Sequence, residues 1–211
     1  VTSSVPGEGK TFTTLNLATV FALAGKRTLI IGADLRKPKL FDELELKNDL
    51  GLSQYLSDMA NMDQIIQQSS IENLHFISGG PMPPNPSELL IRPKMSELMK
   101  QLRSSFDFII LDTPPLAYVS DAFILSTFAD HTLFVVRQDY TPRAALHTLQ
   151  EFYATGKLKN ASVVFNDLRR TGLGYGYSYG YGYGYGYGYG YGNGYGYGYS
   201  KKKRSSDYYI D

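Results

Sequence analysis

Two stretches of this sequence carry residue types that can do chemistry, one near its start and one near its end. The first, VTSSVPGEGKT from Val1 to Thr11, places glycines, a lysine and a hydroxyl residue as in the second half of the phosphate-binding pattern G-x-x-x-x-G-K-[ST]. The second alternates tyrosine with glycine: twelve of the 18 tyrosines lie between Tyr175 and Tyr199, and Tyr208 and Tyr209 follow. A phosphate-binding loop and a strip of phenolic hydroxyls on one chain predict an enzyme that uses ATP to phosphorylate its own kind.

The loop has a defined role for each of its characteristic residues. Gly7 and Gly9 let backbone N–H groups turn inward around phosphate, and Lys10 is expected to reach the β- and γ-phosphates. Thr11 is expected to place its hydroxyl on Mg²⁺, and the following helix N-terminus adds its dipole. Ser4 stands where the pattern has its first glycine, so the match is incomplete. The competing interpretation is a glycine-rich turn before an ordinary helix.

Two aspartates follow apolar segments and are candidate metal ligands. Asp112 closes FIILD, and a carboxylate at the tip of a buried strand suits Mg²⁺ through water. A helix N-cap or a turn residue is the alternative for Asp112. Asp34, in GADLRKP, follows the apolar segment Thr28 to Gly32 and could hold Mg²⁺ or a hydroxyl.

Two more polar residues lie close to these segments. Arg36 could steady phosphate or a neighbouring subunit, and Asn166 could contact the base or simply occupy a turn. The predicted catalytic set is Lys10, Asp34 and Asp112, and the predicted metal set is Thr11, Asp34 and Asp112. The predicted nucleotide-binding set is Gly7, Glu8, Gly9, Lys10, Thr11, Phe12, Arg36 and Asn166.

Length and composition restrict the class of protein. The 211 residues contain no cysteine, which excludes disulfides and thiolate metal sites, and the formal net charge of +1 gives no sign of nucleic-acid binding. No apolar run approaches the ~18 residues of a membrane span, and no signal-peptide pattern opens the chain. His75, His131 and His147 show no metal-binding spacing, so we take them as surface or packing residues.

Short apolar segments alternate with helical patterns along the first ~170 residues. This order predicts the α/β class, with a mostly parallel sheet covered by helices on both faces and ligands at the carboxyl ends of the strands. We expect one helix from Ser87, as its cap, to about Ser104, and one or two short helices in Gly51 to Gln68. The other expected helices are 11–25, 121–128 and 142–155, and the expected strands are 28–32, 74–77, 106–112, 131–137 and 162–166.

The two ends of the chain differ from this pattern. Only Val1 and Thr2 are available for a strand before the loop, so we expect a domain of residues 1–170 whose first strand is largely missing along with its N-terminal part. Residues 171–211 are expected to be a disordered tail, because Gly-Tyr repeats offer little with which to build a core. The basic patch Lys201 to Arg204 is expected to solubilise this end or to attract anions.

These motifs resemble those of the bacterial tyrosine kinases of capsule and exopolysaccharide systems. The resemblance covers Val1 to about Asn166 and the tail. It is carried by SSVPGEGKT (the Walker A loop), TLIIGADLRKP (Walker A′), FIILDTPP (Walker B), SGGPMPPNPSELL and the tyrosine-rich C-terminus.

The resemblance implies a P-loop NTPase domain related to ParA and MinD, and a Mg²⁺-ATP kinase that phosphorylates tail tyrosines of a neighbouring subunit in a ring. It also implies a transmembrane activator on a separate chain or fused upstream, a cognate phosphotyrosine phosphatase, a role in polymer length and export, and a place at the cytoplasmic face of the inner membrane. The expected acceptors are Tyr175, Tyr177, Tyr179, Tyr181, Tyr183, Tyr185, Tyr187, Tyr189, Tyr191, Tyr195, Tyr197, Tyr199, Tyr208 and Tyr209.

The sequence departs from the family pattern at one site position and leaves two other functions open. Walker A′ usually has two aspartates spaced by one residue, and here Gly32 replaces the first, so Asp34 would serve alone as ligand and base unless metal-assisted positioning suffices. One alternative is a ParA- or MinD-like ATPase switch without kinase activity, although no lysine precedes Lys10 in the loop. The other is a condensing tail that associates through aromatic contacts.

Overall fold

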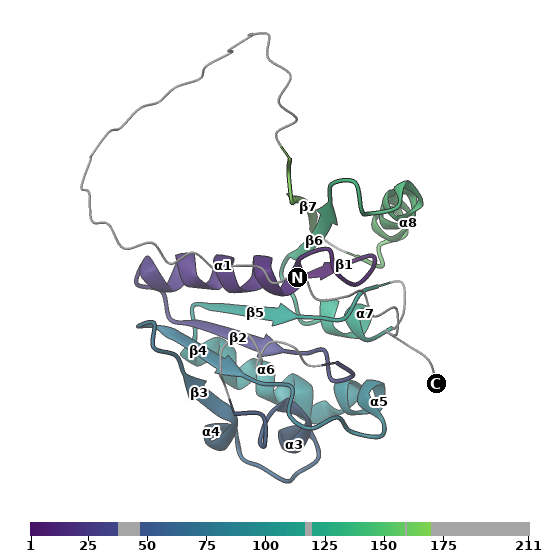
Figure 1. Cartoon of the computed structure of the whole chain (residues 1–211). Coiled ribbons are helices and arrows are strands. Elements are labelled where there is room, and N and C mark those ends of the chain that lie inside the picture. Colours follow the sequence, from purple (N-terminus) through teal and green to yellow (C-terminus); the bar gives the residue numbers. More distant parts are fainter. Residues whose placement is uncertain (38–46, 117–119, 159, 170–211) are drawn as a thin grey trace, which may run out of the picture. The chain divides into compact units, whose positions relative to one another are not determined.

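The computed structural model describes residues 1–37, 47–116, 120–158 and 160–169 (Figure 1). The chain divides into a unit of Val1–Leu168 and a unit of Arg169–Asp211, and the description below concerns the first. The predicted tail and all fourteen predicted acceptor tyrosines lie outside the described residues. Within the described ranges, no helix is both long and apolar enough to cross a bilayer.

Within the described residues of this unit, seven strands form two groups. One sheet has the order β3-β4-β2-β5, and the other has the order β1-β6-β7. All pairs are parallel except β3 with β4, so the carboxyl ends of the other strands point to one edge. The strands are β1 (Thr2–Ser3), β2 (Thr28–Gly32), β3 (Ile66–Gln68), β4 (Leu74–Ile77), β5 (Phe108–Asp112), β6 (Thr132–Arg137) and β7 (Ala161–Asn166).

The two sheets meet where β1 passes the end of β5. Thr113 donates its amide to the carbonyl of Val1 at 3.2 Å, and Leu116 donates its amide to the carbonyl of Ser3 at 2.8 Å. On its other side β1 pairs with β6, with Thr2 opposite Phe134. The start of the phosphate loop is therefore hydrogen-bonded to the segment that follows Asp112.

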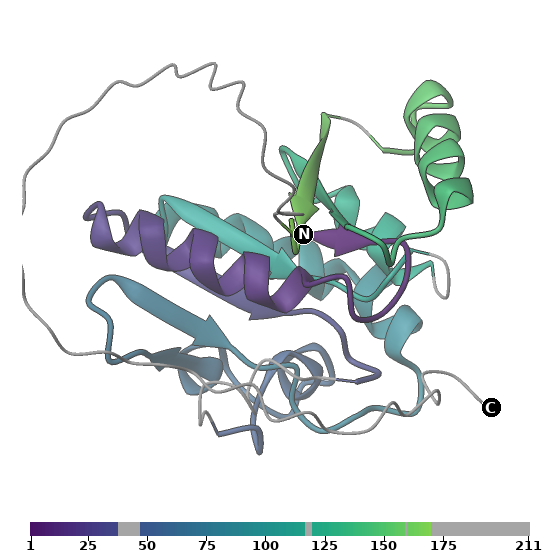
Figure 2. The ribbon, with the colours of Figure 1, turned by 45° about the horizontal axis from the view of Figure 1, so that its top comes forward.

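Helices cover both faces of the sheet, as predicted (Figure 2). The side chains of β2 alternate between the two layers. Ile30 packs with Ala18 and Ala22 of α1 (Lys10–Leu23) on one face, whereas Leu29 and Ile31 belong to the larger core on the other face. That second core is completed by α3 (Leu52–Leu56), α4 (Met62–Ile65), α5 (Pro86–Ile91), α6 (Pro93–Ser105) and α7 (Asp121–Ser126). The predicted α/β class is confirmed.

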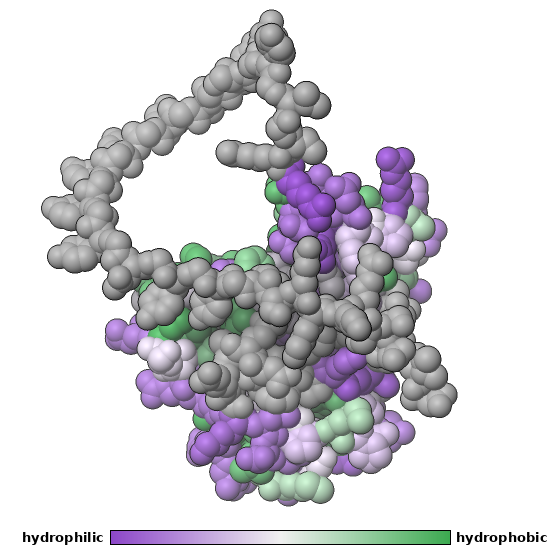
Figure 3. Space-filling model, in the orientation of Figure 1, coloured by the Kyte–Doolittle hydropathy of each residue, from purple (hydrophilic) through white to green (hydrophobic). Residues whose placement is uncertain are grey.

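Helix α1 carries the phosphate loop at its N-terminus and ends in a glycine-dependent turn. Gly25 has φ of 75°, and its amide donates to the carbonyl of Ala22 at 2.9 Å. The amide of Lys26 donates to the carbonyl of Phe21 at 3.1 Å, which completes a Schellman motif. The exposed side chains of Val20 and Leu23 contribute hydrophobic surface near this end of α1 (Figure 3).

Two predictions of local structure are wrong. The helix expected from Ser87 to Ser104 is two helices, because Arg92 precedes Pro93 and is held extended at φ −58° and ψ 145°. The first of them is capped at Asn85 instead of Ser87. The helical prediction for Gly51 to Gln68 fails at its end, where Ile66–Gln68 forms β3 and pairs antiparallel with β4. Sheet pairing overrides the local pattern there.

The core on the α6 side depends on side chains that are fully removed from solvent. Leu98 of α6 is 0% exposed, so Leu98→Ala is expected to lower the free energy of unfolding by about 2–5 kcal/mol through lost burial and a residual cavity. Leu23→Ala in α1 is the matched control: its side chain is 75% exposed, and a change within about 0.5 kcal/mol is expected. Urea unfolding measures both variants, and equal losses would contradict this assignment of the core.

Candidate nucleotide-binding site

The phosphate loop is built around one buried carboxylate. Glu8 is 0% exposed, and its Oε1 accepts a hydrogen bond from the Ser4 hydroxyl at 2.8 Å. Its Oε2 accepts one from the amide of Val5 at 2.8 Å, and the Thr141 hydroxyl also donates to Oε1. These bonds hold the two ends of the loop against each other. The Glu8 side chain thus stabilises the loop conformation from the inside. Of Glu8, only the backbone is available to contact a nucleotide.

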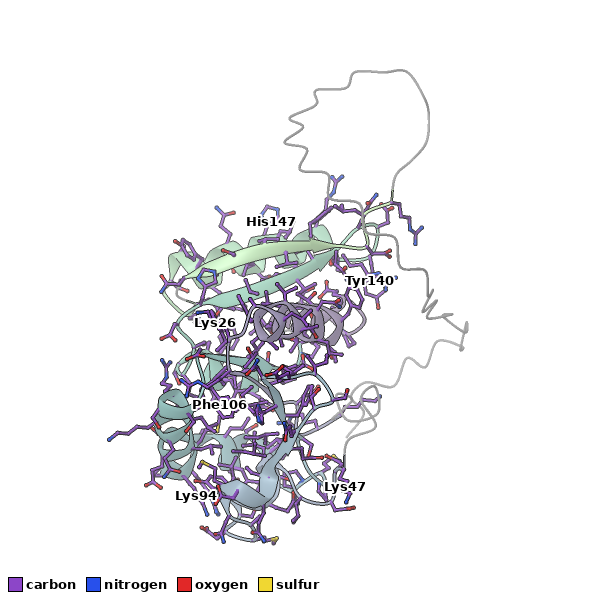
Figure 4. All side chains as sticks on the ribbon, turned by 90° about the vertical axis from the view of Figure 1, so that its left-hand side faces the viewer. Lys26, Lys47, Lys94, Phe106, Tyr140 and His147 are labelled. Carbon is purple, nitrogen blue, oxygen red and sulfur yellow. The ribbon has the colours of Figure 1, made fainter. Side chains whose placement is uncertain are left out.

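The last residue of β6 and the segment after it contact the phosphate loop through their side chains. Arg137 donates from Nη1 to the carbonyl of Gly7 at 2.8 Å, and the Tyr140 hydroxyl donates to the carbonyl of Pro6 at 2.9 Å. The guanidinium of Arg137 lies 5.0 Å from the centre of the Tyr140 ring. Tyr140 lies between β6 and α8 (Arg143–Ala154), whereas His147 is exposed on α8 itself (Figure 4).

The hydrogen bonds to the carbonyls of Pro6 and Gly7 also restrict the amides of the loop. Because the carbonyls of Pro6 and Gly7 accept hydrogen bonds from Arg137 and Tyr140, the backbone between Pro6 and Lys10 is held in one conformation, and its amides are candidates for binding an anion. Arg137, Tyr140 and Thr141 are not among the site residues that the sequence predicted. Arg137 ends β6, and Tyr140 and Thr141 follow it, at the edge where such sheets bind ligands; this position was the available signal.

Both glycines of the loop occupy positions that a side chain would disturb. Gly7 has φ of 82°, and a Cβ there would lie 3.0 Å from the Tyr140 hydroxyl. Gly9 has φ of 98°, and a Cβ there would lie 2.0 Å from Nδ2 of Asn166. That Nδ2 donates to the carbonyl of Glu8 at 3.0 Å. The structure therefore places Asn166, a predicted base contact, against the backbone of the phosphate loop.

The predicted catalytic and metal residues of α1 and β5 come together. Lys10 and Asp112 are both buried, at 8% and 6% exposure. The ammonium of Lys10 donates to the Ser3 hydroxyl at 3.0 Å, and the Thr11 hydroxyl donates to Oδ2 of Asp112 at 2.8 Å. Phe12, the next residue of α1, is 55% exposed.

Burial dominates the electrostatics of Asp112. It raises the pKa of Asp112 to about 6, while the hydrogen bond from Thr11 and the positive charge of Lys10 act in the opposite direction. The negative charge of Asp34 adds to the increase in pKa. A cation bound beside Asp112 would favour its ionised form.

Asp34 follows the end of β2, separated from it by Ala33, and β2 is the strand that pairs with β5, which ends at Asp112. Gly32 pairs with Asp112 in the parallel register, and the amide of Ala33 donates to the carbonyl of Asp112 at 2.8 Å. Oδ1 of Asp34 accepts hydrogen bonds from the amides of Arg36 at 3.2 Å and Lys37 at 3.0 Å. The residue at the first Walker A′ position, Gly32, contributes no side chain to this edge.

The donor atoms of this edge fit Mg²⁺. Oδ1 of Asp112 is buried and accepts no hydrogen bond from the part of the chain that the structure describes. The Thr11 hydroxyl, Asp112 and Asp34 offer oxygen atoms only, which is the chemistry Mg²⁺ prefers while it keeps several waters. The described ranges hold no cluster of three or more His, Cys, Asp or Glu side chains that could form a different metal site.

Arg36 is oriented differently from the prediction that it steadies phosphate. Its Nε donates to Oδ2 of Asp121 at 2.9 Å, and its Nη2 donates to the Ser87 hydroxyl at 2.8 Å. The structure thus connects Arg36 to α5 and α7. Its role toward phosphate or a neighbouring subunit stays a prediction.

Comparison with known proteins places this geometry in a family. Residues 3–163 match the family described as AAA domain. The chain is 40% identical to the tyrosine-protein kinase YwqD of Bacillus subtilis over 166 residues, which are 79% of this chain and 70% of YwqD. Against several longer putative tyrosine-protein kinases it spans only 22% of their length.

Solved structures that resemble this chain also include a tyrosine kinase domain. The kinase domain of the Escherichia coli tyrosine kinase ETK superposes with a TM-score of 0.77 at 31% identity, covering 85% of this chain and 71% of that domain. The septum site-determining protein MinD of Pyrococcus horikoshii, complexed with Mg-ADP, superposes with a TM-score of 0.62 at 21% identity, covering 76% of this chain and 65% of MinD. The likeness to MinD concerns the fold, and it confirms the predicted ParA/MinD-like class.

Gly9 offers a direct test of the loop geometry. Gly9→Ala is expected to weaken binding of a fluorescent ADP analogue at least about tenfold, because a Cβ would meet Asn166 and the left-handed backbone would be strained. Gly25→Ala is the matched control: it also has positive φ, at 75°, but has no atom within 4 Å of the added Cβ. Gly25→Ala should lower stability by about 1–2 kcal/mol and leave affinity unchanged. Equal affinities for both variants would contradict the assigned loop.

Proposed function

Because this chain belongs to the bacterial tyrosine kinases of the capsule and exopolysaccharide type, we propose that it transfers the γ-phosphoryl group of Mg²⁺-ATP to tyrosines in the tail of a neighbouring copy. The observation that carries the proposal is the convergence of Lys10, Thr11 and Asp112 at the phosphate loop. One chain that supplies both an ATP site and many acceptor hydroxyls needs no other protein substrate.

The proposed reaction relies on placement and charge. The amides of the loop and the ammonium of Lys10 hold the β- and γ-phosphates, and Thr11, Asp34 and Asp112 hold Mg²⁺, which supplies charge neutralisation on the phosphates when bound. The tyrosine oxygen forms a bond to the γ-phosphorus as the bond to the ADP oxygen breaks. The phenolic proton, of ordinary pKa about 10, passes to the carboxylate of Asp34.

The tail sequence suits transfer between copies. Glycines between tyrosines keep a chain flexible, so many registers can enter one site. We propose a ring of kinase domains in which each tail reaches the next site. A transmembrane activator, fused upstream or separate, and a phosphotyrosine phosphatase would act on this cycle at the cytoplasmic face of the inner membrane. Its output would be control of capsule or exopolysaccharide synthesis and export.

Lys10 tests the kinase site. Lys10→Met is expected to abolish tail labelling by Mg²⁺-ATP, because the phosphates lose their buried positive partner, and to leave the fold intact. Mass spectrometry of phosphotyrosine in residues 175–209 is the measurement. Lys26→Met, which removes an exposed lysine at the far end of α1, should label as the parent protein does.

Two further outcomes complete this test. Replacement of the tail tyrosines by phenylalanine should stop labelling while ATP still binds. Labelling of Lys10→Met at the parent rate would show the site assignment to be wrong. No labelling of the parent protein, with ATP bound, would indicate a nucleotide switch instead of a kinase.

Phosphorylation is expected to reduce oligomer size. In an extended chain, tyrosines two positions apart lie about 7 Å from each other. Two phosphates there, each of charge about −2, repel by roughly 2 kcal/mol in water before salt screening. Repulsion summed over several pairs opposes packing of tails in a ring. Light scattering of phosphorylated and phosphatase-treated protein tests this expectation, and identical sizes would disprove it.

A further inference from the structure

A closed group of three polar side chains lies beside the proposed metal edge. The Arg36 guanidinium donates from Nε to Asp121 at 2.9 Å and from Nη2 to the Ser87 hydroxyl at 2.8 Å. The Ser87 hydroxyl in turn donates to the other carboxylate oxygen of Asp121. Each member therefore contacts both of the others. We call Arg36, Ser87 and Asp121 the arginine triad.

The arginine triad is largely removed from solvent. The side chain of Asp121 is 1% exposed and that of Arg36 is 30% exposed. A carboxylate this buried is retained only when its charge and both oxygens are matched, and here one guanidinium and one hydroxyl provide the match. The triad joins three segments that are distant in sequence: the segment after β2, the first turn of α5 and the first residue of α7.

The segment after β2 is the one that carries Asp34. The amide of Arg36 donates to Oδ1 of Asp34 at 3.2 Å, and the amide of Lys37 donates to the same oxygen at 3.0 Å. Arg36 thus contacts Asp34 through its backbone while its side chain is held by Asp121 and Ser87. Anchoring the guanidinium restrains the backbone of Arg36, and the amide of that backbone donates to the Asp34 carboxylate.

We propose that Arg36 is a positioning residue: through the arginine triad it holds the Asp34 carboxylate toward the Thr11 and Asp112 oxygens, so that Mg²⁺ binds with the nucleotide. This inference rests on the proposed function of Asp34 as a magnesium ligand. It assigns Arg36 a role through Asp34, in place of direct contact with phosphate. Residues that orient a metal ligand without touching the metal typically contribute 10–100-fold to metal affinity.

The experiment titrates Mg²⁺ into the full chain bound to a fluorescent ATP analogue. Arg36→Ala is expected to raise the Mg²⁺ concentration for half-maximal response by about 10–100-fold. Its affinity for the analogue in EDTA should stay unchanged, because the loop and Lys10 are intact. The matched control is Arg27→Ala, at the opposite end of β2, whose guanidinium pairs with Asp107 at 2.8 Å. Arg27→Ala should leave the Mg²⁺ midpoint unchanged.

Asp121→Asn provides a second route to the same answer if Arg36→Ala does not fold. The asparagine keeps the shape of the side chain and its bond from Ser87 but removes the charge that holds the guanidinium, so the Mg²⁺ midpoint should rise in the same direction. A lower melting temperature with an unchanged midpoint in a folded triad variant would overturn the proposal and leave the triad a structural feature only.

The Mg²⁺ titration is independent of phosphoryl transfer. If the parent protein fails to label its tail, the kinase proposal fails, yet a raised midpoint in Arg36→Ala and Asp121→Asn would still support the positioning role. If the parent protein labels its tail and both variants bind Mg²⁺ as it does, the kinase proposal stands and the positioning role is excluded.

Discussion

The hydrogen bonds that the end of β5 makes on both of its sides are the constraint on which the candidate site depends. On one side Asp112 pairs with Gly32 of β2, and on the other Thr113 bonds to Val1 at the start of the phosphate loop. In this position β5 brings two segments that are distant in sequence, β2 and the start of the phosphate loop, next to the Asp112 carboxylate. The short reach of an aspartate side chain then suffices for Thr11 of α1 to bond to Asp112 at 2.8 Å.

Around this carboxylate, the structure shows which side chains shape the phosphate loop. Glu8 satisfies hydroxyls and an amide of the loop with a fully buried side chain, and Arg137 and Tyr140 engage its carbonyls from outside. A loop held from both sides loses little conformational entropy when phosphate binds, which is the advantage of preorganised amides. Burial of Lys10 and Asp112 strengthens their electrostatic interactions in the same way.

The Asp34 carboxylate is held by hydrogen bonds from backbone amides that follow it in the sequence. With Gly32 in place of the first Walker A′ aspartate, Asp34 is the residue of that motif that supplies a carboxylate next to Asp112. Its Oδ1 accepts hydrogen bonds from the amides of Arg36 and Lys37, and the Arg36 side chain pairs with the buried Asp121, which is the basis of the proposed positioning role. A carboxylate oriented in this way can serve as ligand and base without a second acidic residue beside it.

The sequence by itself determined the α/β class and most element positions, because these rest on apolar periodicity. The glycines of the loop and the carboxylates at strand ends led to the prediction of Lys10, Thr11, Asp34 and Asp112 as site residues. The sequence also determined the tyrosine-rich tail, whose structure lies outside the described residues.

The tertiary structure alone decided what depends on contacts distant in sequence. It showed that Ile66–Gln68 pairs with β4, that Arg36 turns to Asp121, and that Asn166 and Tyr140 contact the phosphate loop. For each of these residues, the local sequence is also compatible with a different secondary structure or a different set of contacts. The physical reason is that hydrogen-bonding partners and burial, which select among the alternatives, are set by chain segments that meet only after folding.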